Sequence, residues 1–215
     1  MKFEKDYLYH IYNQGNNRQR IFFNRENYLF FLKKIKTHIT PYTDILAWCL
    51  MPNHFHLMAL VNELSLPLNK LSMSSKYINS SEGVAQSEPL ANRTLNQSIG
   101  IMLRSYTNAI NKQENFTGSL FRRTTKAECI NCPNGIAPSF YNTEFATKIL
   151  VSNPEIQYPQ VCFEYLHQNP VNAGLVREET EWEFSSAQDY AGIRNGILVN
   201  KKIAQEFVII ARDSL

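Results

Sequence analysis

The pattern of hydrophobic and polar positions predicts strands, a helix and a tight hairpin in the first part of the chain. The first predicted strand is rich in Tyr and the next two are short apolar runs, whereas the apolar positions of the predicted helix recur every three or four residues. Asn24 can cap this helix, and Pro52-Asn53 interrupts two apolar runs as a turn. The expected elements are a strand at 3–12, a polar turn at 13–20, a helix at 25–38, and strands at 44–51 and 54–61.

The later part of the chain is less regular. A stretch rich in Ser and Asn, residues 63–94, has broken periodicity and indicates a long surface connection or insertion. Asn169-Pro170 is expected to close a short helix, because a proline cannot donate the hydrogen bond that would continue it. The expected elements are a helix at 95–112, a basic strand at 119–130, short helices at 142–151 and 159–168, and a loop at 182–190 that leads into a short C-terminal helix.

Composition is that of a globular protein. The chain has 215 residues, of which 44% are hydrophobic and 12% aromatic, so it can bury a sizeable core. We expect one catalytic domain over residues 1–200 and a C-terminal extension at 201–215. A net charge of +3 permits a local basic patch without requiring one. No apolar run approaches the roughly 18 residues that a membrane span needs, and no secretory signal is visible, so we expect a cytoplasmic protein without a membrane partner.

Four cysteines occur, and Cys129 and Cys132 form a single C-x-x-C. In a cytoplasmic protein we expect reduced thiols. A structural zinc site would need two further ligands at suitable spacing, and no second C-x-x-C supplies them. A small zinc protein built on these two cysteines therefore remains only an alternative.

The sharpest chemical feature is a pair of histidines two residues apart. On a strand, residues i and i+2 project to the same face, so His54 and His56 point together while Phe55 and Leu57 point to the opposite face. Neutral imidazole is a common ligand of divalent first-row metals. The spacing favours a metal site, and the plain alternative is two polar residues on the wet face of a strand.

A second group of polar residues completes this hypothesis. A metal that acts as a Lewis acid needs a third ligand and open positions. In the segment FEYLHQNP, a helix would place Tyr165 and Asn169 at i and i+4 on one face. Tyrosine can act as a covalent nucleophile, although an ordinary pKa of about 10 means that it needs a base or a cation nearby. The alternative is a tyrosine that only packs.

The segments LAWCLMPNHFHLM, FEYLHQNPVNAGLV and WEFSS together resemble the single-tyrosine HUH transposases, most closely the REP-associated tyrosine transposases. The resemblance covers about residues 7–190. It implies an α+β fold, with a ferredoxin/RRM-like antiparallel sheet of about four or five strands and helices packed against it. It also implies that His54 and His56 bind Mg²⁺ or Mn²⁺ and that Asn169 completes the site, with Gln168 and His167 as less well-placed substitutes.

The resemblance implies DNA nicking and rejoining by transesterification. Tyr165 would attack the scissile phosphorus, form a 5′-phosphotyrosine link and release a 3′-hydroxyl. The expected partner is single-stranded or hairpin DNA, and the protein is expected to be a monomer or homodimer. The alternatives are a non-catalytic single-stranded nucleic-acid-binding module and an inactive domesticated relative. Phosphate contacts are expected from basic residues that could equally form a solvated face: Arg18, Arg20, Arg122, Arg123 and Lys126.

Overall fold

The centre of the fold is a four-stranded sheet in which every neighbouring pair is antiparallel, in the order β2-β3-β1-β6. The computed structural model describes residues 1–73, 91–132 and 154–210. Strand, helix, two strands, helix and strand follow one another along the chain, which is the ferredoxin-like order and confirms the predicted α+β class. The strands are β1 (Leu8–Gln14), β2 (Thr43–Met51), β3 (His54–Val61) and β6 (Lys126–Cys129).

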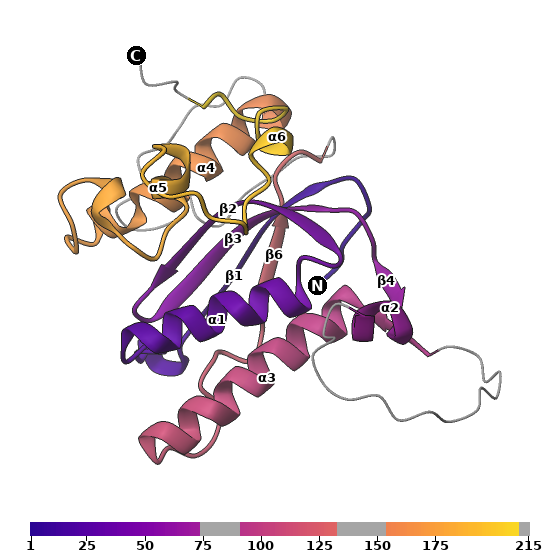
Figure 1. Ribbon diagram of the computed structural model, residues 1–215, viewed down its shortest axis with the longest axis vertical. Helices are drawn as coiled ribbons and strands as arrows, with labels where there is room; N and C mark the ends of the chain where they lie inside the picture. Colours follow the sequence, from indigo (N-terminus) through magenta and orange to yellow (C-terminus); the bar gives the residue numbers. More distant parts are fainter. Residues whose placement is uncertain (74–90, 133–153, 211–215) are drawn as a thin grey trace.

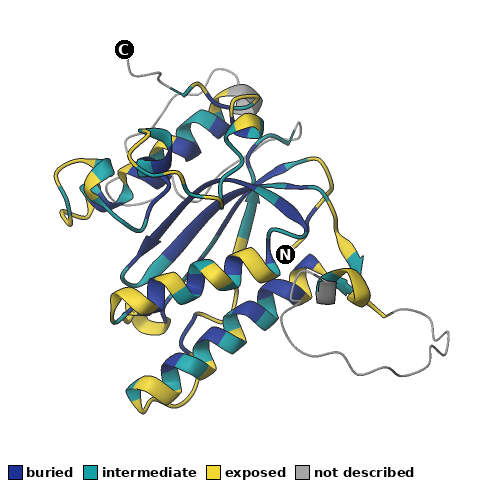
Figure 2. Ribbon diagram, viewed as in Figure 1, coloured by how far each residue is buried: buried dark blue, intermediate teal, exposed yellow. Residues whose placement is uncertain are grey.

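Helices cover both faces of the sheet (Figure 1). On one face, α1 (Arg25–His38) and α3 (Leu95–Glu114) enclose a core that includes Phe55 and Leu57. On the other face, α4 (Pro154–Asn172) packs with the short helices α5 (Ala187–Tyr190) and α6 (Lys201–Ala204), and the core there includes Met58. The central strands are therefore buried on both sides, as Figure 2 shows. None of the helices in the described ranges is long and apolar enough to cross a membrane.

The two long helices begin where the sequence predicts. The Asn24 side chain accepts a hydrogen bond from the backbone N–H of Asn27, and the Asn27 side chain accepts one in return. Thr94 and Gln97 form the same reciprocal cap at the start of α3. Each cap satisfies backbone donors that have no partner inside the helix. The helix predicted at 25–38 is confirmed, and the one predicted at 95–112 extends to Glu114.

Two of the predicted strands have different limits in the structure. Asp6 has a φ of 67°, which a strand does not accommodate, so β1 begins at Leu8 and not at residue 3. The basic strand predicted at 119–130 is a continuous strand only from Lys126 to Cys129, and before it a single bridge joins Phe121 to Gly15. Between these two paired parts, the Asn13 side chain donates to the Arg122 carbonyl and to Thr125 Oγ1. The predicted strand is therefore interrupted at this point.

Helix α4 is longer than predicted and continues through Asn169-Pro170 to Asn172. A proline removes its own N–H donor, but its φ suits a helix, and Pro170 lies only two residues from the end. The chain turns away after Asn172 at Gly174, whose φ of 68° lets its N–H donate to the Val171 carbonyl. The short helix predicted at 142–151 lies outside the described residues.

The ends of the predicted insertion at 63–94 pair with each other. Strand β4 (Ser65–Pro67), which leads into α2 (Leu68–Met73), pairs antiparallel with β5 (Asn92–Thr94). At the other end of the chain, α6 packs against β2, and both Ala204 and Val208 are buried. Residues 201–210 therefore contribute to the second core, although the sequence analysis set them apart as an extension. Two single turns, η1 (Asn16–Arg18) and η3 (Glu179–Glu181), complete the described elements.

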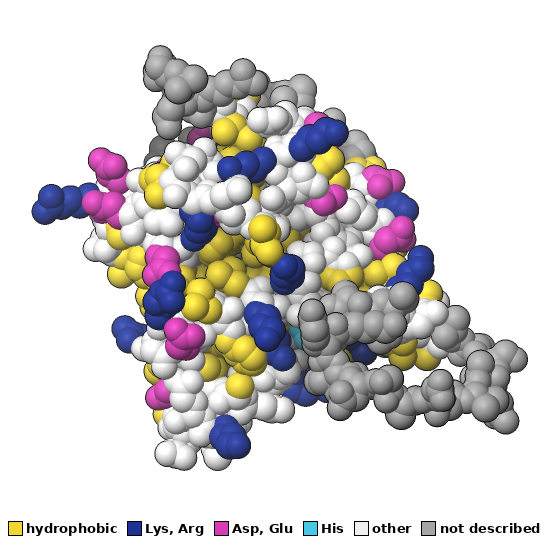
Figure 3. Space-filling view, in the orientation of Figure 1, with side chains coloured by type: hydrophobic (Ala, Val, Ile, Leu, Met, Phe, Trp, Pro, Cys, Tyr) yellow, Lys and Arg dark blue, Asp and Glu magenta, His cyan; other side chains and the backbone are white. Residues whose placement is uncertain are grey.

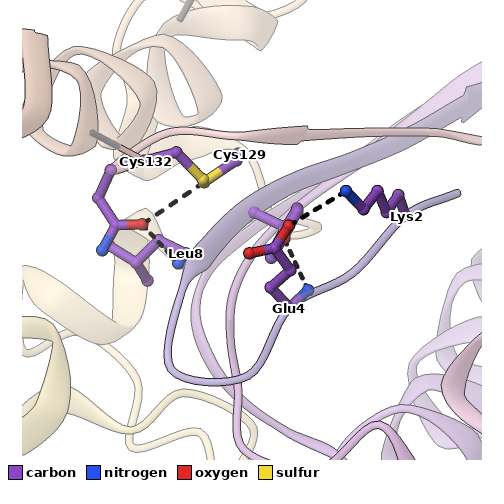
Figure 4. Close-up of a disulfide and its surroundings, with 7 residues drawn as sticks. Lys2, Glu4, Leu8, Cys129 and Cys132 are labelled. Atoms are coloured by element: carbon purple, nitrogen blue, oxygen red, sulfur yellow. Dashed lines mark hydrogen bonds and ion pairs between the residues drawn. A yellow bond between two sulfur atoms is a disulfide. The ribbon is translucent and has the colours of Figure 1, made fainter. Parts of the chain in front are cut away.

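Cys129 and Cys132 are joined by a disulfide at the end of β6, so the expectation of reduced thiols is wrong for this pair. Their Cα atoms lie 5.8 Å apart. The disulfide lies beside Leu8 (Figure 4), whose backbone N–H donates to the Asn131 side chain at 2.8 Å. Bonded to each other, the two sulfurs are not available to zinc, and the zinc alternative loses its ligands.

Candidate active site

The predicted histidine pair faces a cavity between β3 and α4. His54 and His56 project toward α4, with their ring centroids 4.9 Å apart, whereas Phe55 and Leu57 lie in the core on the opposite face. Phe55 is fully buried and contacts the ring of Phe31 on α1. The strand thus anchors the two imidazoles through the apolar residues that alternate with them, as the two-residue period predicts.

Strand β1 brings a third histidine that the sequence analysis did not single out. Tyr12 lies directly opposite His56 in the sheet register, so both share the face toward α4. His10 lies two residues before Tyr12 and therefore on the same face of β1. It is fully buried, and its Nε2 atom lies 2.8 Å from Nδ1 of His56. The signal was present in the sequence, because His10, Tyr12 and Gln14 alternate with the same period as His54 and His56.

Helix α4 lies over β3, as the interpretation of the histidine pair required. Cys162 and Leu166 are buried in the second core and hold the helix against the sheet. One position before Leu166, the half-buried Tyr165 presents its ring edge-on to His56, with centroids 5.5 Å apart. A tyrosine and a histidine more than a hundred residues apart in the sequence are thereby brought into contact.

Asn169, one turn after Tyr165, is the polar residue of this helix that reaches the histidines. Its side-chain amide acts on both the His54 imidazole and the Tyr165 phenol, and its Nδ2 atom donates to the Tyr165 backbone carbonyl at 3.5 Å. The two substitutes considered from the sequence lie elsewhere: the exposed Gln168 donates to Glu179, and the buried His167 hydrogen-bonds to Ser186 at 2.8 Å. Of Asn169, Gln168 and His167, only Asn169 lies next to both the predicted nucleophile and a predicted metal ligand.

Burial sets the protonation states of the site. It lowers the pKa of His10 to about 3 and that of His54 to about 4. The pKa of His56 is also well below its ordinary value, through burial first and then the proximity of the other two imidazoles. Burial raises the pKa of Tyr165, and the hydrogen bond from Asn169 opposes this rise. At neutral pH the site therefore holds three neutral imidazoles and a protonated phenol.

The donor atoms suit a divalent cation held by few protein ligands. The Nε2 atom of His56 is buried and has no hydrogen-bond partner among the described residues, while Nδ1 of His54 lies 2.6 Å from the Asn53 side chain. The described parts of the chain contain no group of three His, Cys, Asp or Glu that could hold a metal ion. The available set is two imidazoles and the Asn169 amide oxygen, which would leave positions for phosphate oxygens.

Two of the five predicted basic residues lie at this cavity, which has a volume of about 370 Å³. Arg122 and Lys126 are exposed and line its wall together with the histidines and Tyr165. Arg123 lines a neighbouring groove instead. Arg18 and Arg20 are exposed in the segment after β1 and do not line the cavity.

No protein-family model matches the sequence, and no curated protein matches it either. Among solved structures, the chain is similar to a REP-associated tyrosine transposase bound to a REP hairpin. The two superpose with a TM-score of 0.50 over 89% of this chain and 83% of that one, at 13% sequence identity. At this identity the similarity is one of fold, and it agrees with the resemblance in the sequence motifs.

Proposed function

We propose that this protein is a metal-dependent DNA endonuclease and strand transferase of the tyrosine-transposase type, acting on hairpin or palindromic single-stranded DNA. The observation that carries the proposal is the placement of Tyr165 over the His54/His56 pair, with Asn169 one helical turn away and next to both. A nucleophile and a cation site that share one small cavity are what phosphoryl transfer requires. The fold similarity to a transposase bound to a DNA hairpin supports the choice of substrate.

The reaction is a transesterification at one phosphodiester. The Tyr165 oxygen loses its proton and forms a bond to phosphorus, while the bond from phosphorus to the 3′ oxygen breaks and that oxygen gains a proton. The product is a 5′-phosphotyrosine and a free 3′-hydroxyl. A second 3′-hydroxyl then attacks the same phosphorus and releases the phenol, so the number of ester bonds is conserved and no nucleotide cofactor is needed.

His54, His56 and Asn169 would hold Mg²⁺ or Mn²⁺, because all three lie where β3 meets α4 and burial keeps both imidazoles neutral. A bound divalent ion supplies polarisation of the scissile phosphate. The Asn169 side chain, beside the Tyr165 phenol, favours its ionised form against the effect of burial. Arg122 and Lys126, at the cavity wall, supply positive charge for the phosphate group.

The test is a search for a covalent protein–DNA adduct. We expect the purified protein, given a hairpin oligonucleotide with single-stranded flanks and Mg²⁺ or Mn²⁺, to form a species that survives denaturing electrophoresis. Tyr165→Phe should abolish this species, and Tyr158→Phe, which removes a hydroxyl from the same helix, should not. Binding of the hairpin without any adduct would favour the non-catalytic nucleic-acid-binding module instead.

A further inference from the structure

Three hollows that share wall residues follow one another from the active-site cavity to α3. The cavity shares Asn13, Arg122 and Thr124 with a groove of about 890 Å³ beside α3. That groove in turn shares Asn96, Gly100 and Arg104 with a third hollow of about 590 Å³. A flexible ligand in one hollow therefore contacts residues that also line the next one. We call the two outer hollows the α3 trough.

The Lys, Arg, Asp and Glu side chains that line these hollows are all basic. Among the described residues, the linings of all three hollows contain no Asp or Glu, although the chain as a whole has 19 acidic residues against 22 basic ones. On the face drawn in Figure 3, by contrast, acidic and basic side chains are interspersed. The basic residues along the path are Arg93, Arg104, Arg122, Arg123 and Lys126.

These basic side chains are available to a ligand. None of the five forms an ion pair with a carboxylate in the described parts of the chain. Arg104, Arg122 and Arg123 are exposed, and Arg93 is partly so. The remaining walls carry amides and hydroxyls such as Asn96, Asn108 and Ser119, which contact sugars and phosphates in nucleic-acid complexes.

The floor of the trough contains a glycine in the middle of a helix. Gly100 lies in α3, where glycine is less favourable than alanine by about 0.5–1 kcal/mol. A Cβ atom built at Gly100 meets no other atom within 4 Å, so packing inside the protein does not require a glycine there. Its absent side chain instead leaves open the point where the two outer hollows meet.

We infer that the α3 trough binds the DNA strand that leads away from the cleaved phosphate. The inference rests on the proposed function for the position of that phosphate, and it adds the path of the flanking nucleotides. The twelve residue steps from Asn96 to Asn108 span about 18 Å of helix axis at about 1.5 Å per step. At roughly 3.4 Å per nucleotide, the trough accommodates about five nucleotides.

The experiment measures how a flank changes affinity. Hairpins with no flank, or with single-stranded flanks of two, five or eight nucleotides on the 5′ or the 3′ side, are titrated against protein carrying Tyr165→Phe. The same titrations are made with Gly100→Ala, Gly100→Gln and Gly100→Glu added. In the parent and with Gly100→Ala, we expect a flank on one of the two sides to lower the dissociation constant at least tenfold. The gain should grow with flank length up to about five nucleotides.

With Gly100→Gln most of this improvement should be lost, and with Gly100→Glu all of it, while the melting temperature is maintained. Arg104→Ala should reduce the slope of log affinity against log salt by about one for the flanked hairpin, and Arg177→Ala, an exposed control outside the trough, should not. An equal flank effect in Gly100→Ala and Gly100→Glu would overturn the inference.

The experiments distinguish a failure of the trough inference from a failure of the proposed function. If the trough is wrong and the proposed function right, protein with an intact Tyr165 forms its covalent adduct and Gly100→Glu leaves the flank effect unchanged. If the proposed function is wrong and the trough right, no adduct appears under any condition, yet the flank effect still disappears with Gly100→Glu.

Discussion

The Nε2 atom of His10 lies 2.8 Å from the Nδ1 atom of His56, and both residues are buried. In such a contact one nitrogen donates and the other accepts. When His56 Nδ1 donates to His10, the Nε2 atom of His56 keeps its lone pair for a cation. A partner of this kind fixes the tautomer and the ring orientation of a metal-binding histidine. His10 is therefore a positioning residue for the proposed metal site.

Replacing His10 should weaken metal binding. We expect His10→Ala to weaken the affinity for Mn²⁺ by about 10- to 100-fold, because loss of a ligand's orienting partner typically has an effect of this size. His10→Gln, whose amide can reach the position of Nε2, should recover part of the loss. Isothermal titration of the DNA-free protein measures this directly, with His38→Gln on α1 as the control. Equal affinities in His10→Ala and the parent would exclude a positioning role.

Asn169 should have separable effects on the metal and on the nucleophile. Asn169→Ala removes the amide that lies beside His54 and Tyr165, so we expect adduct formation to slow by about tenfold or more. Asn169→Asp should bind Mn²⁺ more tightly, because it adds a carboxylate oxygen, and yet react more slowly than the parent, because a negative charge beside the Tyr165 phenol disfavours its ionised form. Single-turnover rates and Mn²⁺ titrations distinguish the two effects. Gln168→Ala is the neighbouring control, and unchanged rates in Asn169→Ala would contradict the assignment.

Buried histidines should make the metal-free protein sensitive to acid. Burial lowers the pKa of His54 and of His167 to about 4, whereas in the unfolded chain each imidazole takes a proton near pH 6.5. The unfolded state therefore binds more protons between these values. Their contribution to stability is complete above about pH 6.5 and is lost as the pH falls, by up to about 1.4 kcal/mol per pH unit for each histidine.

Urea unfolding at pH 7.5 and pH 5.5 measures this loss. We expect a clearly lower midpoint at pH 5.5, and a smaller difference between the two pH values for His167→Gln, which removes one of the buried imidazoles. The same midpoint at both pH values would mean that these histidines are protonated in the folded protein.

The elements that could be predicted from the sequence were those with strong local signals. The cap at Asn24 and the period of the following apolar residues located α1, and the alternation around Pro52-Asn53 located β2 and β3. The spacing of His54 and His56 likewise predicted their common face, since a strand leaves no other choice.

The parts of the fold and of the site that the sequence did not predict depend on contacts between segments far apart in the chain. The interruption between β6 and the bridge at Phe121 lies where the Asn13 side chain, more than a hundred residues earlier, hydrogen-bonds to Arg122 and Thr125. Helix α4 continues through Pro170 because packing in the second core outweighs the loss of one hydrogen bond near the helix end. The role of His10 needed the register of β1 against β3, which no local pattern contains, although its alternation with Tyr12 placed it on one face.

The most direct measurement of the central claim is the identity of the residue that becomes attached to DNA. The adduct formed with a hairpin oligonucleotide and Mn²⁺ is digested with a protease and a nuclease, and the modified peptide is sequenced by mass spectrometry. The account predicts a nucleotide joined through its 5′-phosphate to Tyr165, and loss of this peptide when His54 and His56 are both replaced by alanine. Attachment at another residue, or an adduct that persists in Tyr165→Phe, would contradict it.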